Sequence, residues 1–200
     1  MKEKNHDYTE TNLLSALQSG DQAAFRYLVE KFGSKVKRTC MGFVHSESDA
    51  DDLAQEVFVE VFLSSSKFRG ESSVSTWVYR IAVNKSLNFL RSAGRRKLGS
   101  LVEKLTGAEK EYVKEPVSGR EYLPDERLQQ EERSKIIGKA MGKLPENQRT
   151  AFVLSKYDDL SYNEIAGIMN ISLSSVESLL FRARQNLRKL LSDYYKNNME

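Results

Sequence analysis

The segment from Phe68 to Lys97 constrains the fold more than any other, because its side chains sort by polarity at the period of an α-helix. Between Thr76 and about Arg91, one arc of the predicted helix is apolar and holds Val78, Tyr79, Ala82, Val83, Leu87, Phe89 and Leu90. The opposite arc holds Trp77, Arg80, Asn84, Asn88 and Arg91, spaced three, four, four and three residues apart. We expect the first arc to face a hydrophobic core and the second to face solvent or a ligand.

The second arc has the composition of a nucleic-acid-binding surface. Residues 67 to 97 hold eight Lys and Arg residues against one acidic residue, a net charge of +7, whereas the whole chain carries +3. A base can stack on an aromatic face for roughly 1 to 3 kcal/mol, while asparagine recognises base edges and arginine binds phosphate. The arc suits unpaired or unstacking DNA or RNA. The alternative is that Trp77 packs at the edge of a bundle beside a solvated basic face.

Composition favours a helical protein of one or two domains. Of the 200 residues, 40% are apolar and 30% charged, with 3 Pro and 11 Gly. No apolar run approaches the roughly 18 residues of a membrane span, and the N-terminus lacks a signal-peptide core, so we expect a cytoplasmic protein without membrane insertion. The single cysteine, Cys40, excludes an internal disulfide and a cysteine-based zinc cluster. We expect no catalytic residue, metal site or cofactor.

A second charge-sorted segment lies between Ser46 and Leu63, which holds six acidic residues and no Lys or Arg. Four of these acids share one helical face: Asp49, Asp52, Glu56 and Glu60. The opposite arc is apolar: Leu53, Val57, Phe58, Val61 and Phe62. Like charges at this spacing repel, so the row lowers stability unless a basic group or a metal meets it.

Two functions for the acidic row remain open. Acids near Asp49 favour a helix N-terminus, but Glu56 and Glu60 lie too far along the helix for that role. A metal site would need carboxylates from another helix, and no second cluster of that kind occurs in the sequence. A docking face for a basic partner is therefore favoured.

Turn and cap signals divide the chain into four segments. Residues 1–12 form a polar tail that we expect to be disordered, and residues 13–97 form a first helical domain. Residues 98–126 have the Gly, Pro, Lys and Glu content of a flexible linker, and residues 127–195 form a second helical domain. The predicted fold is all-α, with two small helical domains joined by a flexible linker.

Inside the first domain, three helices are expected before the acidic segment. The first runs from Leu13 to Ser19, and the second is capped by Asp21 and runs through Phe32. The third runs from Val36 through Val44.

The second domain contains the pattern of a helix-turn-helix. Ser161 and Glu164 form a capping box before a helix over 162–169, Asn170 suits a left-handed turn residue, and a long helix follows to about Tyr194. Its inward positions are Val176, Leu179, Leu180, Ala183, Leu187 and Leu190, and its outward positions are Ser174, Glu177, Ser178, Phe181, Arg182, Gln185 and Arg188.

The outward face of the long helix suits duplex DNA. Phe181 can contact a thymine methyl group in the major groove, while Arg182 and Arg188 bind phosphate or guanine. The alternatives are that Phe181 touches a neighbouring helix and that Glu177 completes a capping box with Ser174.

Four motifs, in this order and spacing, resemble the sigma-70 family of bacterial transcription initiation factors, specifically its small extracytoplasmic-function (ECF) group. They are DADDLAQEVF at 49–58, FRGESSVSTWVYRIAVNKSLNFLR at 68–91, LPENQRTAFVL, and LSYNEIAGIMNISLSSVESLLFRARQNLRKLL. The resemblance covers about 13–98 and 128–191. It implies that residues 13–97 are sigma region 2 and residues 127–195 are sigma region 4.

The resemblance also implies which residues bind each partner. Core RNA polymerase would be bound by Asp49, Asp52, Gln55 and Glu56. The minus-10 element would be melted and recognised by Phe68, Arg69, Trp77, Arg80, Asn84 and Asn88, to which the polar arc adds Arg91. The minus-35 duplex would be recognised by Ser174, Glu177, Ser178, Phe181 and Arg182, to which the outward face adds Arg188. Glu177 and Leu179 stand where many family members carry basic residues, so no minus-35 sequence can be transferred.

The resulting hypothesis is a transcription initiation factor without catalysis of its own, whose partners are core RNA polymerase and promoter DNA. The family resemblance further implies an anti-sigma factor. A stand-alone helix-turn-helix regulator explains the second domain but leaves the acidic row and the Trp77 arc without a role. A metal-dependent nucleotide hydrolase is the enzyme alternative.

Overall fold

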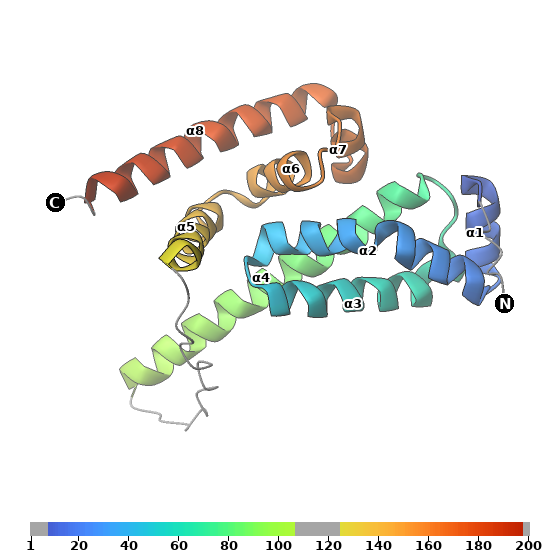
Figure 1. The fold of residues 1–200 in the computed structure, drawn as a ribbon, viewed down its shortest axis with the longest axis horizontal. Coiled ribbons are helices and arrows are strands. Elements are labelled where there is room, and N and C mark those ends of the chain that lie inside the picture. Colours follow the sequence, from blue (N-terminus) through green and yellow to red (C-terminus); the bar gives the residue numbers. More distant parts are fainter. Residues whose placement is uncertain (1–7, 107–124, 198–200) are drawn as a thin grey trace.

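The computed structural model describes residues 8–106 and 125–197, and every regular element in these ranges is helical (Figure 1). In chain order the elements are α1 (Glu10–Gln18), α2 (Gln22–Val44), α3 (Glu47–Ser64), the 3₁₀ turn η1 (Ser65–Lys67), α4 (Val74–Thr106), α5 (Asp125–Gly142), α6 (Glu146–Tyr157), α7 (Tyr162–Met169) and α8 (Leu173–Asn197). The all-α prediction is confirmed. None of the helices in the described ranges is both long enough and apolar enough to cross a membrane.

Helices α1 to α4 share a hydrophobic core. Asp21 caps α2 by accepting the N–H of Ala23, as its residue type predicts. Helices α3 and α4 both pack on α2. The larger buried side chains of this core are Leu13, Leu17, Leu28, Phe32, Val36, Leu53, Val57, Val61, Val74 and Val78. Helix α1 begins at Glu10, inside the segment for which the sequence predicts a tail, and residues 1–7 lie outside the described ranges.

Helix α2 is longer than its sequence pattern predicts. Two helices are expected there, but α2 runs unbroken through Gly33. Leu28, Phe32, Val36 and Cys40 are all buried and lie four residues apart, so a single apolar stripe crosses the glycine. One glycine in a helix costs only about 1 kcal/mol, less than burial of this stripe contributes.

Helix α4 also exceeds its predicted length, because it continues to Thr106 whereas the linker was expected from residue 98. No proline occurs in this part of the chain before Pro116, and isolated glycines weaken a helix without ending it. Residues 107–124 of the predicted linker lie outside the described ranges.

Helices α5 to α8 contain the predicted helix-turn-helix. Ser161 and Glu164 form a complete capping box at the start of α7. Asn170 ends α7 in the left-handed conformation, with φ 53° and ψ 49°, and its N–H donates to the carbonyl oxygens of Ala166 and Gly167. The predicted inward residues of α8 are buried at Val176, Leu180, Ala183 and Leu187 and half-buried at Leu179 and Leu190. The helix-turn-helix is confirmed.

The two helical groups pack against each other. Figure 1 shows α6 and α7 lying over α2 and α4, with α8 on the outer side. Phe43 of α2 and Tyr79, Val83 and Leu87 of α4 belong to the same buried cluster as the core of α5 to α8. The sequence predicts separate domains, yet the described residues of both groups share this hydrophobic core.

Candidate nucleic-acid and protein interfaces

Phe68 and Trp77 form a stacked aromatic pair at the start of α4. Their ring centroids lie 4.4 Å apart and their planes differ by 6°. The side chain of Gln18 donates a hydrogen bond to the carbonyl oxygen of Phe68 at 2.7 Å. Gly70 supplies a φ of +71° in the loop that leads to α4, a conformation that costs glycine little. The loop therefore holds Phe68 against one face of Trp77.

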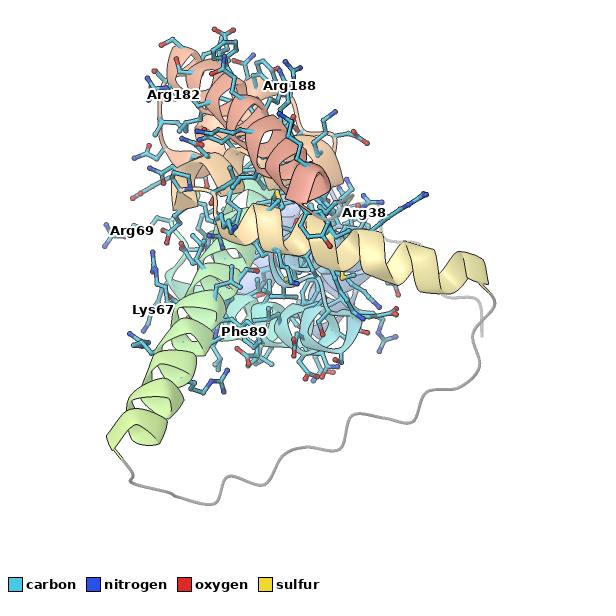
Figure 2. The ribbon with its side chains drawn as sticks, turned by 90° about the vertical axis from the view of Figure 1, so that its left-hand side faces the viewer. Arg38, Lys67, Arg69, Phe89, Arg182 and Arg188 are labelled. Carbon is cyan, nitrogen blue, oxygen red and sulfur yellow. The ribbon has the colours of Figure 1, made fainter. Side chains whose placement is uncertain are left out.

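An open hollow of about 400 Å³ surrounds this aromatic pair. Its other lining residues are Ser64, Lys67, Arg69, Glu71, Ser72 and Arg80. Three cations against one carboxylate give the hollow a positive charge, which attracts phosphate. Figure 2 shows Lys67 and Arg69 projecting outward beside α4. The hollow combines a stacking surface with cations, as sites for single-stranded nucleic acid do.

The other residues of the polar arc on α4 either face solvent or contact the C-terminal helices. Asn84 and Asn88 are exposed. Arg80 donates to the carbonyl oxygens of Gly167 and Ile168 at 2.8 and 3.2 Å. Arg91 forms a bidentate ion pair with Glu146 of α6 and donates to the side-chain oxygen of Asn88 at 3.1 Å.

The acidic row lies on α3, where Asp52, Gln55 and Glu56 are exposed and Asp49 is half-buried. Lys85 of α4 lies 3.8 Å from Glu56 and 3.5 Å from Glu60. This lysine supplies the basic neighbour that the repulsion between the carboxylates requires. Across 8–106 and 125–197, no cluster of three or more His, Cys, Asp or Glu side chains is placed to hold a metal ion.

The sequence analysis did not predict that three apolar residues of α3 lie at the surface. Val59, Phe62 and Leu63 are 58%, 50% and 66% exposed. Phe62, which the sequence analysis places on the apolar arc opposite the acids, is half exposed, and its ring packs edge-on against Phe25. The sequence VFVEVFL contains more apolar residues than one helix face can bury, and that excess was the available signal.

The outward face of α8 is exposed to solvent in the part of the chain that the structure describes. Ser174, Glu177, Ser178, Phe181, Arg182 and Arg188 are all exposed, Phe181 to 60%. Ser172 caps this helix by accepting the N–H of Ser175, so Glu177 is not the partner of a Ser174 capping box. An open hollow of about 560 Å³ beside the helix is lined by Asn147, Met169, Ile171, Ser174, Ser175, Ser178, Leu179 and Arg182.

Two titratable side chains, one buried and one half-buried, lie where the helical groups meet. The carboxylate of Asp158 is fully buried, and burial raises its pKa. Thr39 of α2 donates to one of its oxygens at 2.5 Å, while the Arg38 guanidinium lies 3.7 Å from the other. His45, at the end of α2, has its pKa lowered first by burial and then by Arg149. Asp158 is not among the residues that the sequence analysis singles out.

Comparison with known proteins identifies both helical groups. Residues 28–96 match the family described as Sigma-70 region 2, and residues 134–187 match Sigma-70, region 4. The ECF RNA polymerase sigma-E factor of Escherichia coli K12 is 37% identical over 178 residues, which cover 88% of this chain and 91% of that protein.

Two solved structures share the fold. CnrH in complex with the cytosolic domain of CnrY has a TM-score of 0.65 at 24% identity, covering 92% of this chain and 97% of that chain. The sigma factor RpoE in complex with the anti-sigma factor NepR from Bartonella quintana has a TM-score of 0.53 at 21% identity, covering 84% and 96%. With both region matches and the sigma-E similarity, the chain belongs to the sigma-70 family as an ECF sigma factor, a transcription initiation factor that directs RNA polymerase to promoters.

Proposed function

We propose that this sigma factor divides promoter recognition and polymerase docking among three helices, α3, α4 and α8. It catalyses no reaction of its own, needs no cofactor, and acts in the cytoplasm together with core RNA polymerase. Residues 13–97 act as region 2 and residues 127–195 as region 4. The energy for promoter melting comes from binding.

The minus-10 face carries the recognition of melted DNA. We define it by seven residues: Phe68, Arg69, Trp77, Arg80, Asn84, Asn88 and Arg91. The stacked pair in its cationic hollow is the observation that carries the proposal, because a flat aromatic surface beside cations suits an unstacked base and its phosphate. Asn84 and Asn88 are exposed and offer amide groups to base edges.

The minus-35 face recognises the upstream duplex. It consists of Ser174, Glu177, Ser178, Phe181, Arg182 and Arg188, all exposed on α8. A recognition helix enters the major groove with its N-terminal residues toward the bases, where Ser174, Glu177 and Ser178 lie. Glu177 is available as an acceptor for cytosine N4, and Phe181 as a contact for a thymine methyl group.

The polymerase face lies on α3 and consists of Asp49, Asp52, Gln55 and Glu56. Its charge suits a basic surface on core polymerase, and complementary charge raises the rate of association. Val59 and Leu63 extend this face with exposed apolar side chains. Apolar area beside charged groups is typical of protein interfaces, so these two residues strengthen the assignment to a protein partner.

We also propose that an anti-sigma factor binds this chain. RpoE of Bartonella quintana has been solved in complex with the anti-sigma factor NepR, and that protein shares the present fold. An inhibitor that covers the polymerase face or holds the two helical groups together would block promoter recognition.

Run-off transcription from a promoter library tests the proposed function. Core polymerase is assayed with and without the protein, and specific start sites are expected only when the protein is added. The double variant Asp52→Lys with Glu56→Lys should weaken these transcripts, whereas Glu30→Lys, an exposed acidic position on α2, should leave them unchanged. Binding to duplex DNA without any specific transcript would contradict the proposal.

A further inference from the structure

Helix α1 touches the loop that carries Phe68 at two points. Gln18, the last residue of α1, donates a side-chain hydrogen bond to the carbonyl oxygen of Phe68 at 2.7 Å. Leu14, one turn earlier, lies against Gly70, because a Cβ atom on that glycine would be 2.9 Å from the Cδ2 atom of Leu14. Leu14 and Gln18 are four residues apart, so both contacts come from the same side of the helix.

Helix α1 is anchored by contacts other than those with the loop. Leu13 and Leu17 are each 3% exposed and belong to the core that α1 shares with α2 to α4. Thr9 caps the start of the helix by accepting the N–H of Asn12. Since the core fixes α1, the helix can hold the loop in place without depending on the loop for its own position.

The main chain of Phe68 is held from both sides. Its N–H donates to the carbonyl oxygen of Ser65 at 3.2 Å, and its carbonyl oxygen accepts the hydrogen bond from Gln18. Beyond the loop, Ser73 accepts the N–H of Thr76 at 3.0 Å in the first turn of α4. Gln18 thus fixes the peptide group at which the chain leaves η1 for α4, and with it the direction in which the Phe68 ring points.

We infer that α1 is a positioning element of the minus-10 face, and that Gln18 is the residue that holds Phe68 in its stacked geometry on Trp77. This inference rests on the proposed function of that face. The Sigma-70 region 2 match begins at residue 28, after the end of α1, so that match assigns α1 no role. Gln18 is a positioning residue, because it acts through Phe68 and not on the DNA itself.

Acrylamide quenching of Trp77 fluorescence tests the positioning in the free full-length chain, without DNA. Trp77 is the only tryptophan, and Phe68 covers one face of its ring. Gln18→Met keeps the length of the side chain but removes the donor, so it should raise the quenching constant toward that of Phe68→Ala. Gln22→Met makes the same chemical change at the exposed first residue of α2 and should leave quenching unchanged.

Binding of fluorophore-labelled single-stranded DNA of random sequence, followed by anisotropy, tests the consequence for recognition. Apparent affinity falls with the fraction of molecules whose loop is in place, and one neutral hydrogen bond shifts that equilibrium by roughly 2- to 10-fold. Gln18→Met should therefore bind about two- to tenfold more weakly, whereas Gln22→Met should bind as the unsubstituted protein does. Because Gln18 is exposed, the melting temperature followed by circular dichroism should change little.

A double variant separates positioning from direct contact with DNA. If Gln18 acts through Phe68, Gln18→Met should have little further effect on DNA binding in a Phe68→Ala background, so the two losses are not additive. An equal loss in both backgrounds would overturn the inference, since Gln18 would then act on the DNA itself or on the whole fold.

Two further outcomes would overturn the inference. Unchanged quenching of Trp77 in Gln18→Met means that Gln18 does not position Phe68. Equal DNA binding by Gln18→Met and Gln22→Met means that the position of the loop does not limit recognition. Failure of the unsubstituted protein to initiate transcription with core polymerase would instead contradict the proposed function and leave the quenching result standing.

Discussion

Trp77 shows how a single side chain is prepared for a ligand before the ligand arrives. Phe68 stacks on one face of its ring, and the hydrogen bond from Gln18 to Phe68 fixes the loop that brings the two rings together. A base that stacks on the remaining aromatic surface meets a ring whose rotamer is already restricted. Less conformational entropy is then lost on binding.

Replacing Trp77 should weaken the capture of melted DNA. Because base–aromatic stacking contributes about 1 to 3 kcal/mol, Trp77→Ala should reduce single-stranded DNA affinity roughly 5- to 150-fold. Open complexes should decay faster, as followed by permanganate reactivity of unpaired thymines. Trp77→Phe keeps an aromatic face and should retain most of the activity. Equal promoter melting by Trp77→Ala and the unsubstituted protein would refute the role assigned to this ring.

Lys85 reduces the negative charge of the polymerase face. It lies within 4 Å of Glu56 and Glu60, but the pair is partly exposed and contributes at most about 1 kcal/mol to folding. Lys85→Met should leave stability nearly unchanged and raise the association rate with core polymerase roughly two- to fivefold at low salt. The effect should disappear near 1 M salt, where the Debye length is about 3 Å.

Stopped-flow association kinetics check the Lys85 prediction. Lys156→Met removes one exposed positive charge from α6, away from α3, and should leave the rate unchanged. A slower association of Lys85→Met would show that the lysine itself contacts polymerase.

At the scale of elements, the helix-turn-helix was predictable because its signals are local. The Ser161–Glu164 box and the left-handed Asn170 are set by neighbouring backbone groups, and both appear as the sequence predicts. The lengths of α2 and α4 were not predictable in the same way. Continuation through Gly33 is decided by burial of Leu28 and Val36 against other helices, which the local pattern does not encode.

The sites show the same division between local and long-range information. Periodicity placed Asn84, Asn88 and the outward residues of α8 at the surface, where the structure has them. The contacts of Arg80 and the burial of Asp158 depend on partners more than 85 residues away in the sequence. The close packing of Gly42 likewise depends on helix α6. No single-segment pattern reveals such pairs.

The turn residue Asn170 offers a test at this scale. A β-branched residue at φ 53° costs about 1 to 2 kcal/mol, so Asn170→Val should lower the melting temperature by roughly 2 to 8 °C. Minus-35 duplex binding should weaken as the angle between α7 and α8 changes. Asn170→Gly, which accepts this conformation, should melt close to the unsubstituted protein. Calorimetry and duplex titrations measure both effects, and equal melting of the two variants would contradict the explanation.

At the scale of the whole molecule, the described residues of two independently matched family regions meet in one buried cluster. Two titratable groups lie where these regions meet. These groups are His45 and Asp158, and their pKa values are shifted in opposite directions, downward for His45 and upward for Asp158. The free energy of unfolding is consequently linked to pH through two terms of opposite sign.

The sign of each term follows from proton binding. The folded protein holds fewer protons at His45 than the unfolded chain does, so acidification through the ordinary pKa of 6.5 lowers the free energy of unfolding. It holds more protons at Asp158, so acidification toward the ordinary pKa of 3.8 favours the folded state. The groups that face these side chains are Arg149 for His45, and Arg38, Lys35 and Thr39 for Asp158 together with Tyr79.

Two variants should separate the pH terms. Between pH 7.5 and 5.5, Asp158→Asn should lose stability progressively on acidification, by at most about 1.4 kcal/mol at pH 5.5, because the free imidazole with its ordinary pKa of 6.5 gains only about a tenfold advantage one pH unit below that pKa. His45→Asn should not show this loss of stability over the same range, and asparagine tolerates the left-handed φ of 55° at that position. Thermal unfolding followed by circular dichroism at each pH measures both profiles. A loss of stability in His45→Asn that matches that of Asp158→Asn would exclude His45 as the titrating group, because only Asp158→Asn retains the imidazole.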